Sequence, residues 1–239
     1  MKAMILAAGL GTRLRPLTDT TPKPLISVGG RPLIHYSLLL LKKYDFKDVL
    51  INLHHLGEQI EKALGDGHSF GLNITYSWEP ELLGTGGGIK KAESFFKGET
   101  FLVMNSDILI DVNLKNLIDF HQKKNAVATM VVRPLPTDST DTPVYIGDNG
   151  NILEIGDQPK QHHQKCGYTG VQILNSKMLD YLPEQKASCI IRQAYQPALK
   201  DQLPLFAFHY SGYWNDLGTK YRLQQAENEI LQTHLTFMQ

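Results

Sequence analysis

The sequence has few cysteines and no excess of charge of either sign. Its two cysteines, Cys166 and Cys189, exclude a disulfide framework and a multi-cysteine metal cluster, and they indicate free thiols in a reducing compartment. Lysine plus arginine and aspartate plus glutamate each number 24, so the formal net charge is zero. No global field therefore recruits nucleic acid or an anionic membrane, and any affinity for phosphate must come from a local site.

Long hydrophobic runs and metal-binding histidine motifs are also missing. No stretch reaches the ~18 apolar residues that a membrane-spanning helix needs. The short apolar run at the start of the sequence breaks at once into Gly9, Gly11 and Arg13, without a signal-peptide cleavage segment. The nine histidines, including the adjacent His54 and His55, follow no metal-ligand spacing, and we expect them in loops or on the surface. We expect a cytoplasmic protein without nucleic-acid or membrane partners; a homo-oligomer is compatible with the sequence but not indicated by it.

The order of the apolar segments predicts an α/β protein. Four segments have the character of buried strands: residues 3–8, 47–53, 73–78 and 100–107. Three segments between them have the apolar spacing of helices: residues 31–44, 57–67 and 89–96. This alternation predicts a largely parallel sheet that is covered by helices on both faces.

Beyond residue 125 the pattern changes to strands that are separated by turns and short helices. The expected strands are residues 126–132, 151–155, 167–174 and 203–210. The string DNGN at 148–151 predicts a hairpin turn, and residues 220–234 form an amphipathic helical pattern. The second half is therefore expected to be more antiparallel than the first.

The glycine-rich segment 4–25, MILAAGLGTRLRPLTDTTPKPL, begins with the first expected strand and continues directly beyond it. It fails the dinucleotide motif G-x-G-x-x-G because Leu14 stands at the third glycine, and no G-x-x-x-x-G-K-[ST] occurs in the chain. Gly9 and Gly11 allow backbone N–H groups to approach an anion closely, and Arg13 can bind phosphate oxygens with two nitrogens.

Lys23 would add a point charge to this segment. Pro22 and Pro24 stand on either side of Lys23 and restrict its backbone, so its amine is presented in a fixed direction. The alternative is a solvated turn with ordinary surface bases. The residues alone leave both interpretations open.

Two acidic residues far apart in the chain are candidate metal ligands. Asp107 ends the fourth expected strand in MNSD, and ligands collect at the carboxyl ends of strands in open α/β sheets. Asp216 lies in GYWNDLGT before the last helix. Two carboxylates, triphosphate oxygens and water would complete the octahedral coordination of Mg²⁺. The alternatives are a cap or turn residue at Asp107 and a helix N-terminal acid at Asp216. Asn105 points to the same side of the strand as Asp107.

The segment LAAGLGTRLRPLTDTTPKPLISVGGRPLI, residues 6–34, resembles the signature of the sugar-1-phosphate nucleotidylyltransferases. That signature reads L-A-[AG]-G-x-G-[TS]-R-x-x-P-L-T, then P-K-[PA]-[LM], then G-x-P-[LMI]. NSDIL and GYWNDLGT match the two metal-site motifs of the same family. The resemblance implies that Asp107 and Asp216 hold Mg²⁺ and that Arg13 and Lys23 are catalytic. It implies a nucleotide-binding glycine loop that consists of Ala8, Gly9, Gly11, Thr12, Arg13 and Lys23.

The segment EPELLGTGGG, residues 79–88, resembles the second nucleotide loop of the family, L-[GE]-T-[AG]-G. The resemblance implies that Glu79 or Glu81 approaches the base. It also implies that backbone groups read the base at Gly84, Thr85 and Gly86. Without the resemblance, this segment is a turn that leads into a helix.

The match weakens in the part of the chain where the family contacts its sugar. Gly170 in YTG fits the sugar-contacting glycine, and Asp157 stands for the acid that the family carries nearby. Gln158 replaces the usual lysine, although Lys160 lies close in the sequence. The implied sugar-phosphate contacts are Asn105, Asp157 and Gly170.

The resemblance implies Mg²⁺-dependent transfer of a nucleotidyl group from an NTP to a sugar 1-phosphate, giving an NDP-sugar and pyrophosphate. It favours the short N-acetylmuramate-1-phosphate uridylyltransferases of cell-wall recycling, which use UTP. The alternatives are mannose- or heptose-1-phosphate guanylyltransferases, which use GTP, and a non-catalytic paralogue that binds a nucleotide sugar. The residues do not decide between the bases or the sugars.

The implied fold is a Rossmann-like three-layer αβα structure with a mixed, mainly parallel central sheet and a smaller antiparallel sugar-binding portion. We expect a single nucleotidyltransferase domain over 1–239. Within it we expect a nucleotide-binding half at about 1–112, a sugar-binding half at about 113–218 and a C-terminal helix at 219–239.

Overall fold

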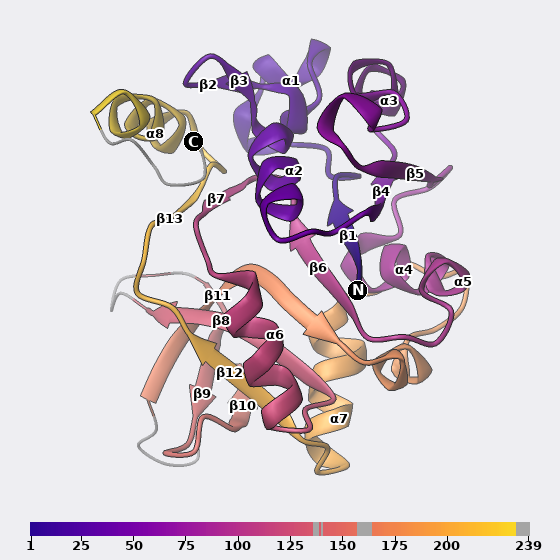
Figure 1. Ribbon diagram of the computed structural model, residues 1–239, viewed down its shortest axis with the longest axis vertical. Coiled ribbons are helices and arrows are strands. Elements are labelled where there is room, and N and C mark those ends of the chain that lie inside the picture. The colour runs from indigo at the N-terminus through magenta and orange to yellow at the C-terminus, as the bar shows by residue number, and fades with distance from the viewer. Residues whose placement is uncertain (136–138, 140, 157–163, 233–239) are drawn as a thin grey trace. The chain divides into compact units, whose positions relative to one another are not determined.

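The computed structural model of the chain describes residues 1–135, 139, 141–156 and 164–232 (Figure 1). The chain forms two compact units. Unit 1 contains residues 1–84 and 104–111 together with the chain from Gly212 onward, and unit 2 contains residues 85–103 and 112–211. Unit 1 is therefore built from three separate segments of the sequence.

Unit 1 contains three parallel strands, β1 (Lys2–Leu6), β4 (Asp48–Leu53) and β5 (Asn73–Trp78). The central strand β4 pairs with both neighbours, so that Asn52 lies opposite Leu6 of β1 and opposite Ser77 of β5. The apolar side chains of β1 and β4 except Leu6 are buried because both strands are covered by other elements. The predicted strands at 3–8, 47–53 and 73–78 are confirmed within one or two residues.

Helices connect these strands as the sequence pattern predicts. Helix α2 (Leu33–Lys43) precedes β4, and helix α3 (Gly57–Leu64) leads from β4 to β5. Helix α3 ends because Gly65 adopts a φ of 56°, which glycine reaches without a steric penalty. The helix predicted over 31–44 is two residues shorter at its start, since Arg31 and Pro32 form the short strand β3 (Arg31–Pro32), which pairs with β2 (Ser27–Val28).

The segment between β1 and β2 folds into three short helical turns. They are η1 (Thr12–Leu14), α1 (Leu17–Thr20) and η2 (Lys23–Leu25). Leu14 is completely buried, whereas Arg13 beside it is exposed. The glycine-rich segment therefore anchors itself through an apolar side chain while its arginine remains accessible.

The last part of the chain completes unit 1. Strand β13 (Trp214–Asp216) pairs antiparallel with β7 (Ile108–Ile110), and helix α8 (Lys220–Gln232) follows (Figure 1). Leu223, Ala226 and Ile230 of α8 are buried in one apolar cluster of the unit. Its other buried members come from five separate elements or loops: Leu14, Val28, Leu33, Tyr36, Leu109 and Leu217.

Unit 2 contains an antiparallel arrangement around the long strand β11 (Gln164–Leu174). Strands β8 (Ala128–Pro134) and β9 (Pro143–Ile146) both pair antiparallel with β11, and β10 (Ile152–Ile155) pairs antiparallel with β9. Strand β12 (Leu205–His209) pairs in parallel with β8. The turn predicted at 148–151 joins β9 to β10, with Gly150 at a φ of 77°.

The helices of unit 2 are α4 (Gly84–Lys91), α5 (Glu93–Phe96), α6 (Leu114–Lys123), η4 (Ser176–Tyr181), the π-helical turn η5 (Ile191–Tyr195) and α7 (Gln196–Lys200). The helix predicted over 89–96 in fact begins at Gly84 and is interrupted at Ala92. Glycine has a low helix propensity, so a start within GTGGG is not visible from propensity alone. Sequence analysis also missed α6, whose Phe120 contacts the rings of Phe206 and Phe208.

The predicted fold class, a mixed and mainly parallel sheet with helices and a smaller antiparallel portion, is confirmed. Strand β6 (Phe101–Asn105) ends two residues before Asp107, whereas the prediction extended it to that residue. The division into halves near residues 112 and 218 stays a prediction. Within the described chain, no helix combines the length and the apolar character needed to cross a membrane.

Candidate active site

The glycine loop after β1 depends on one glycine for its shape. Gly11 has a φ of 63°, and a Cβ atom there would lie 2.7 Å from Cγ2 of Thr18. The Thr18 hydroxyl donates a hydrogen bond of 2.9 Å to the Gly11 carbonyl oxygen. Only glycine fits this position, both for its backbone angle and for its space. Gly9 is exposed and Thr12 is an exposed member of the same loop, whereas Ala8 is buried.

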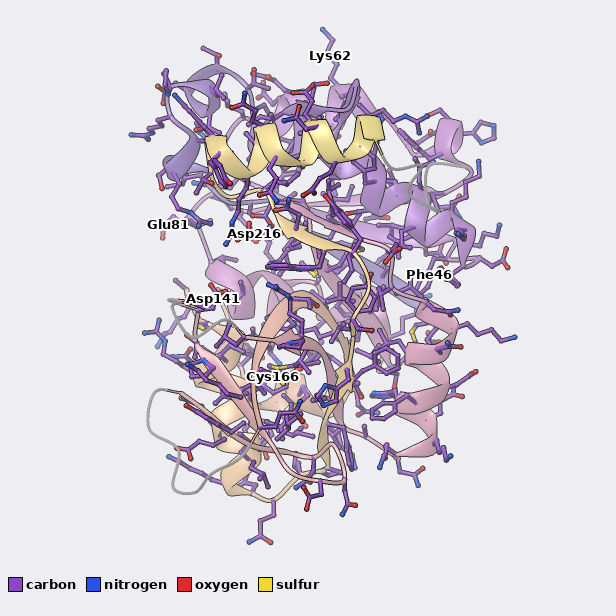
Figure 2. The ribbon with its side chains drawn as sticks, turned by 90° about the vertical axis from the view of Figure 1, so that its left-hand side faces the viewer. Phe46, Lys62, Glu81, Asp141, Cys166 and Asp216 are labelled. Carbon is purple, nitrogen blue, oxygen red and sulfur yellow. The ribbon has the colours of Figure 1, made fainter. Side chains whose placement is uncertain are left out.

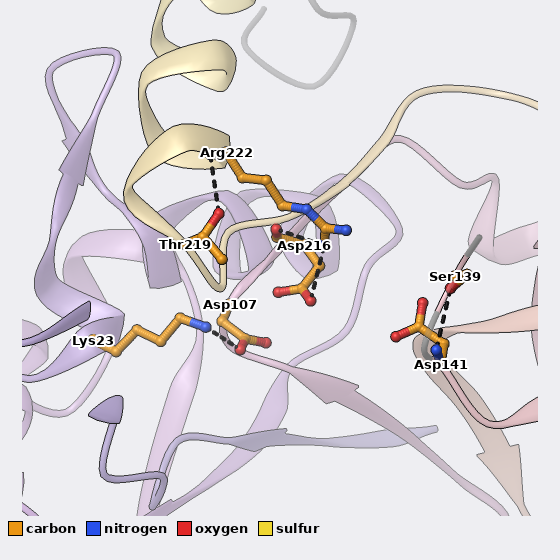
Figure 3. Close-up of polar contacts among 7 residues, drawn as sticks. All are labelled: Lys23, Asp107, Ser139, Asp141, Asp216, Thr219 and Arg222. Carbon is orange, nitrogen blue, oxygen red and sulfur yellow. Dashed lines mark hydrogen bonds and ion pairs between the residues drawn. The ribbon is translucent and has the colours of Figure 1, made fainter. Parts of the chain in front are cut away.

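Lys23 lies at the start of η2 and is only 9% exposed. Its Nζ atom donates a hydrogen bond to Oδ2 of Asp107 and forms an ion pair with it (Figure 3). The prediction that Lys23 is held in a fixed direction agrees with this geometry. Its partner is the predicted metal ligand Asp107, a contact that no sequence pattern had indicated.

Asp107 and Asp216 are brought to the same place by the pairing of β7 with β13. Asp107 directly precedes β7, and Asp216 ends β13 opposite Ile108. The amide of Leu217 donates a hydrogen bond of 3.0 Å to the carbonyl oxygen of Asp107, which closes the pair of strands. Figure 2 labels Asp216 on the strand directly before α8, and Figure 3 shows both carboxylates with their partners. Residues 109 positions apart thus share one site.

The charges around Asp216 act on the pKa of its carboxyl group in opposite directions. Burial, and next the negative charge of Asp107, raise the pKa of the Asp216 carboxyl group. The positive charges of Lys23, Arg13 and Arg222 oppose that rise. Two carboxylates and three cations therefore lie within electrostatic range of one another, which is suited to binding a polyphosphate with a divalent cation.

Arg222 is a site residue that sequence analysis missed. From the first turn of α8 its Nη1 atom donates to Oδ2 of Asp216 at 3.2 Å and to the Asp216 carbonyl oxygen at 3.3 Å. The available signal was an arginine six residues after Asp216, just inside the predicted helix. It was overlooked because a basic residue on a polar helix face is usually solvated.

Arg13 reaches the same region through contact with Gly218. A Cβ atom at Gly218 would lie 2.7 Å from Nη2 of Arg13 and 2.8 Å from its Cζ and Nη1 atoms. The guanidinium group therefore lies directly against the glycine backbone that follows β13. This contact brings the glycine loop and the GYWNDLGT motif together at one place.

The donor set fits a hard divalent cation that is shared with a substrate. Oδ1 of Asp216 is buried and has no hydrogen-bond partner among the described residues. A buried carboxylate oxygen without a partner is costly, and a cation would satisfy it. The described residues contain no cluster of three or more His, Cys, Asp or Glu side chains suited to a metal ion. The remaining ligands of a cation at Asp107 and Asp216 would have to come from substrate oxygens and water.

The second predicted nucleotide loop begins at a buried carboxylate. Glu79 is 2% exposed, and its Oε1 and Oε2 atoms accept hydrogen bonds from Asn52 Nδ2 at 2.7 Å and from the Leu83 amide at 2.9 Å. Its predicted contact with a base stays a prediction, as does that of the exposed Glu81. Gly84 is exposed and has a φ of 68°.

The other predicted site residues lie as follows. In unit 2 the Thr85 hydroxyl accepts a hydrogen bond from the Ile190 amide at 3.1 Å, and the Gly86 amide donates one to the Ser188 carbonyl oxygen at 2.8 Å. Gly170 is buried at a φ of 91°, within the irregular part of β11. Asn105 is half-buried at the end of β6 in unit 1. Asp157 lies outside the described residues, as do Gln158 and Lys160. The roles of all these residues in binding stay predictions.

Comparison with known proteins places the chain in a family. Residues 2–233 match the family described as nucleotidyl transferase. The chain is 34% identical to a UTP–glucose-1-phosphate uridylyltransferase of Synechocystis, over 100% of this chain and 66% of that protein. It is 37% identical to an N-acetylmuramate alpha-1-phosphate uridylyltransferase of Neisseria meningitidis, over 95% of this chain and 97% of that protein. It is 34% identical to a mannose-1-phosphate guanyltransferase of Candida albicans, over 91% of this chain and 61% of that protein.

A solved structure agrees with this result. The structure of a Bacillus anthracis protein, described as a putative glucose-1-phosphate thymidylyltransferase in complex with a sucrose, superposes with a TM-score of 0.82 at 26% identity. The match covers 96% of this chain and 94% of that one.

The chain belongs to the nucleotidyl transferase family, whose members named above are sugar-1-phosphate nucleotidylyltransferases. The predicted family is confirmed. The chain spans 66% and 61% of the length of two of these relatives and nearly the whole of the Neisseria one.

Proposed function

We propose that this protein transfers a nucleotidyl group from an NTP to a sugar 1-phosphate and releases pyrophosphate. The observation that carries the proposal is the cluster of Lys23, Asp107 and Asp216 with Arg13 against Gly218. It combines basic groups for phosphates with two carboxylates for a cation. The names of the related proteins support the same reaction.

The chemistry needs charge stabilisation more than proton transfer. A phosphate oxygen of the sugar 1-phosphate is already ionised at neutral pH, so its attack on the α-phosphorus needs no general base. The bond between the α-phosphorus and its bridging oxygen breaks, and pyrophosphate leaves with that bond's electron pair. Arg13 is exposed on the glycine loop, where it can bind the α-phosphoryl and leaving oxygens. Lys23 holds a second positive charge beside Asp107, where it can bind phosphate oxygens.

Asp107 and Asp216 would hold a divalent cation, for which we propose Mg²⁺. Such an ion would supply positive charge that neutralises the charge developing on the phosphate oxygens. The buried Oδ1 atom of Asp216, which lacks a hydrogen-bond partner among the described residues, supports this role. Arg222 orients the same carboxylate through its Oδ2 atom.

For the particular substrates we propose UTP and N-acetylmuramate 1-phosphate. The Neisseria relative of this name supports the assignment because it matches over nearly the full length of both chains. GTP with mannose or heptose 1-phosphate is the alternative, and the Candida relative, a mannose-1-phosphate guanyltransferase, supports it over 61% of its length.

A matrix of the four common NTPs against several sugar 1-phosphates tests the proposal, with Mg²⁺ present and pyrophosphate release measured. We expect the highest rate with UTP and N-acetylmuramate 1-phosphate and loss of activity on chelation. The highest rate with GTP and a mannose or heptose phosphate would select the alternative substrates. No release in any combination, together with tight binding of a nucleotide sugar, would contradict catalysis and favour a non-catalytic binding protein.

A further inference from the structure

The carboxyl end of β4 holds a buried polar link between the two loops that are proposed to bind the nucleotide. Asn52 lies next to last in β4 and is 2% exposed. Its Oδ1 atom accepts a hydrogen bond of 2.8 Å from the amide of Ala7, the first residue after β1. Its Nδ2 atom donates a hydrogen bond of 2.7 Å to Oε1 of Glu79, the first residue after β5. One side chain thus joins the start of the glycine loop to the start of the second loop.

Glu79 extends this link into the second loop itself. Its Oε2 atom accepts a hydrogen bond of 2.9 Å from the Leu83 amide, directly before Gly84. The chain Ala7–Asn52–Glu79–Leu83 therefore uses both polar groups of the Asn52 side chain and both oxygens of the Glu79 carboxylate. Because both side chains are buried, water cannot replace these hydrogen bonds without an opening of the structure.

The two histidines after β4 secure the backbone of the same loops. A carbonyl oxygen only accepts hydrogen bonds, so His54 donates from Nδ1 to the Glu79 carbonyl oxygen at 2.8 Å. His55 likewise donates from Nε2 to the Thr18 carbonyl oxygen at 3.0 Å. Thr18 in turn binds Gly11 of the glycine loop. Asn52 near the end of β4 and His54 and His55 directly after it thus contact both loops.

We infer that Asn52 and Glu79 are positioning residues that fix the distance between the glycine loop and the second loop, and thereby set the affinity for the nucleotide. This inference rests on the proposed function. The Glu79 carboxylate acts through the Leu83 amide and the loop that follows, because its two oxygens are already used inside the protein. Neither residue needs to touch the phosphates. Their loss should therefore change nucleotide binding far more than turnover at saturating nucleotide.

The chemistry of the link allows a sharp test by exchange. In Asn52→Asp a carboxylate faces the Glu79 carboxylate, so the hydrogen bond between the two side chains is lost. In Glu79→Gln the side-chain NH2 group at position 79 faces one of the two donors that the carboxylate accepted from, Asn52 Nδ2 or the Leu83 amide. In the double variant Asn52→Asp/Glu79→Gln, the carboxylate at position 52 accepts from the Ala7 amide and from the side-chain amide nitrogen at position 79. The side-chain oxygen at position 79 then accepts from the Leu83 amide. All three hydrogen bonds return with unchanged net charge.

We expect each single variant to raise the KM for UTP or GTP, whichever the wild type uses, by about tenfold or more, in keeping with the loss of a buried hydrogen bond to a charged group. The KM for the sugar phosphate and kcat should change by less than about threefold, because neither residue touches the reacting groups. The double variant should recover most of the nucleotide affinity. Calorimetric titration with the same NTP, without the sugar phosphate, provides a readout that is independent of turnover.

Asn73→Ala is the matched control. Asn73 Nδ2 donates to Asp48 Oδ1 at 3.0 Å. This exposed hydrogen bond joins the first residues of β5 and β4, at the end of these strands that lies away from Asn52 and Glu79. This variant should leave the nucleotide KM unchanged. If the single variants lower the melting temperature but leave nucleotide KM and affinity unchanged, or if the double variant does not recover, the inference is wrong although the proposed function stands. If the wild type neither binds nor turns over any NTP, the proposed function fails first and the inference fails with it.

Discussion

At the scale of single residues, the site depends on charges that are held by short-range contacts. Lys23 is the clearest case because its amine is bound to Asp107 in the structure and is nearly buried. The sequence motif predicted Lys23, Asp107 and Asp216 as site residues, and the structure brings these three together. It did not predict Arg222 or Asn52, because a helical arginine and a strand asparagine have many ordinary uses.

Lys23→Ala should abolish detectable turnover, a fall of at least about 10³-fold, because it removes a positive charge from the proposed phosphate site. The fold should survive, as judged by circular dichroism and a cooperative melt. The control is Arg15→Ala, which removes a surface ion pair with Asp19 from the same loop and should change turnover little. Wild-type turnover in Lys23→Ala would contradict the assigned role.

Gly218→Ala should displace the Arg13 guanidinium, since a Cβ atom would come within 2.8 Å of three of its atoms. The displaced group is the free end of a flexible side chain, so we expect a nearly unchanged melting temperature. Turnover should fall by about tenfold to a hundredfold, because a displaced catalytic group loses its orientation.

The same substitution in an Arg13→Ala background tests the cause of this effect. The obstacle is then absent, so Gly218→Ala should cost little further activity in steady-state assays. Additive losses would show that Gly218 matters for another reason.

At the scale of elements, the parallel strands and their crossover helices were predictable because their apolar patterns are strong. The start of α4 at Gly84 was not predictable from helix propensity, because the first turn consists mainly of glycines and tertiary packing decides it. Gly86 lies so close to Ser188, Leu182 and Ile190 that a Cβ atom would meet them at 2.7–3.1 Å. The glycine run therefore allows α4 to pack closely inside unit 2.

Gly86→Ala should lower the free energy of unfolding by about 1–3 kcal/mol, because the added methyl group forces the packed neighbours apart. Urea denaturation measures the change. The control is Glu93→Ala, which removes an ion pair with Lys90 in which the Glu93 side chain is 45% exposed, and should cost less than about 1 kcal/mol. Equal effects of the two substitutions would contradict the packing argument.

Helix α6 should make the stability of the fold depend on pH through His121. This side chain is 5% exposed, its Nδ1 atom is 2.9 Å from the Thr129 hydroxyl, and burial lowers its pKa from 6.5 to about 4. Well above pH 6.5 the ring is neutral in both the folded and the unfolded chain, and its contribution to stability is complete. Between pH 6.5 and about 4 only the unfolded chain takes up this proton, so stability falls as the pH falls, by about 3 kcal/mol in total.

Urea denaturation from pH 7.5 to 4.5 should show this loss in the wild type. His121→Gln should be less stable than the wild type at pH 7.5. Its free energy of unfolding should fall less with falling pH, by the amount that protonation of one histidine contributes. Parallel pH profiles of the two proteins would contradict the assignment to His121.

At the scale of the whole molecule, unit 1 is discontinuous in sequence. The expected halves follow the order of the chain, whereas Leu223, Ala226 and Ile230 of α8 lie in the same apolar cluster as Leu14 and other residues from the first 112 positions. A hydrophobic pattern read along the chain shows which faces are apolar but not which partner covers them. The family signature could place Asp107 and Asp216, the proposed metal ligands, together because it summarises contacts that local patterns lack.

A fragment of residues 1–112 should fail to fold on its own, because it lacks β13 and α8 and exposes Leu14, Leu33, Tyr36 and Leu109 of the cluster to water. We expect no cooperative thermal transition by circular dichroism. The full chain is the control. A cooperative melt of the fragment would show that the first half is an independent folding unit.

The pairing of β13 with β7 also sets an order in time. The ribosome makes Lys23 and Asp107 early, but Asp216, Gly218 and Arg222 follow more than a hundred residues later. The charge cluster therefore cannot assemble on a nascent chain that has only reached β7. A product that ends before residue 216 lacks Asp216, one of the two carboxylates of the site. The complete cluster therefore requires translation at least as far as Arg222, the third residue of α8.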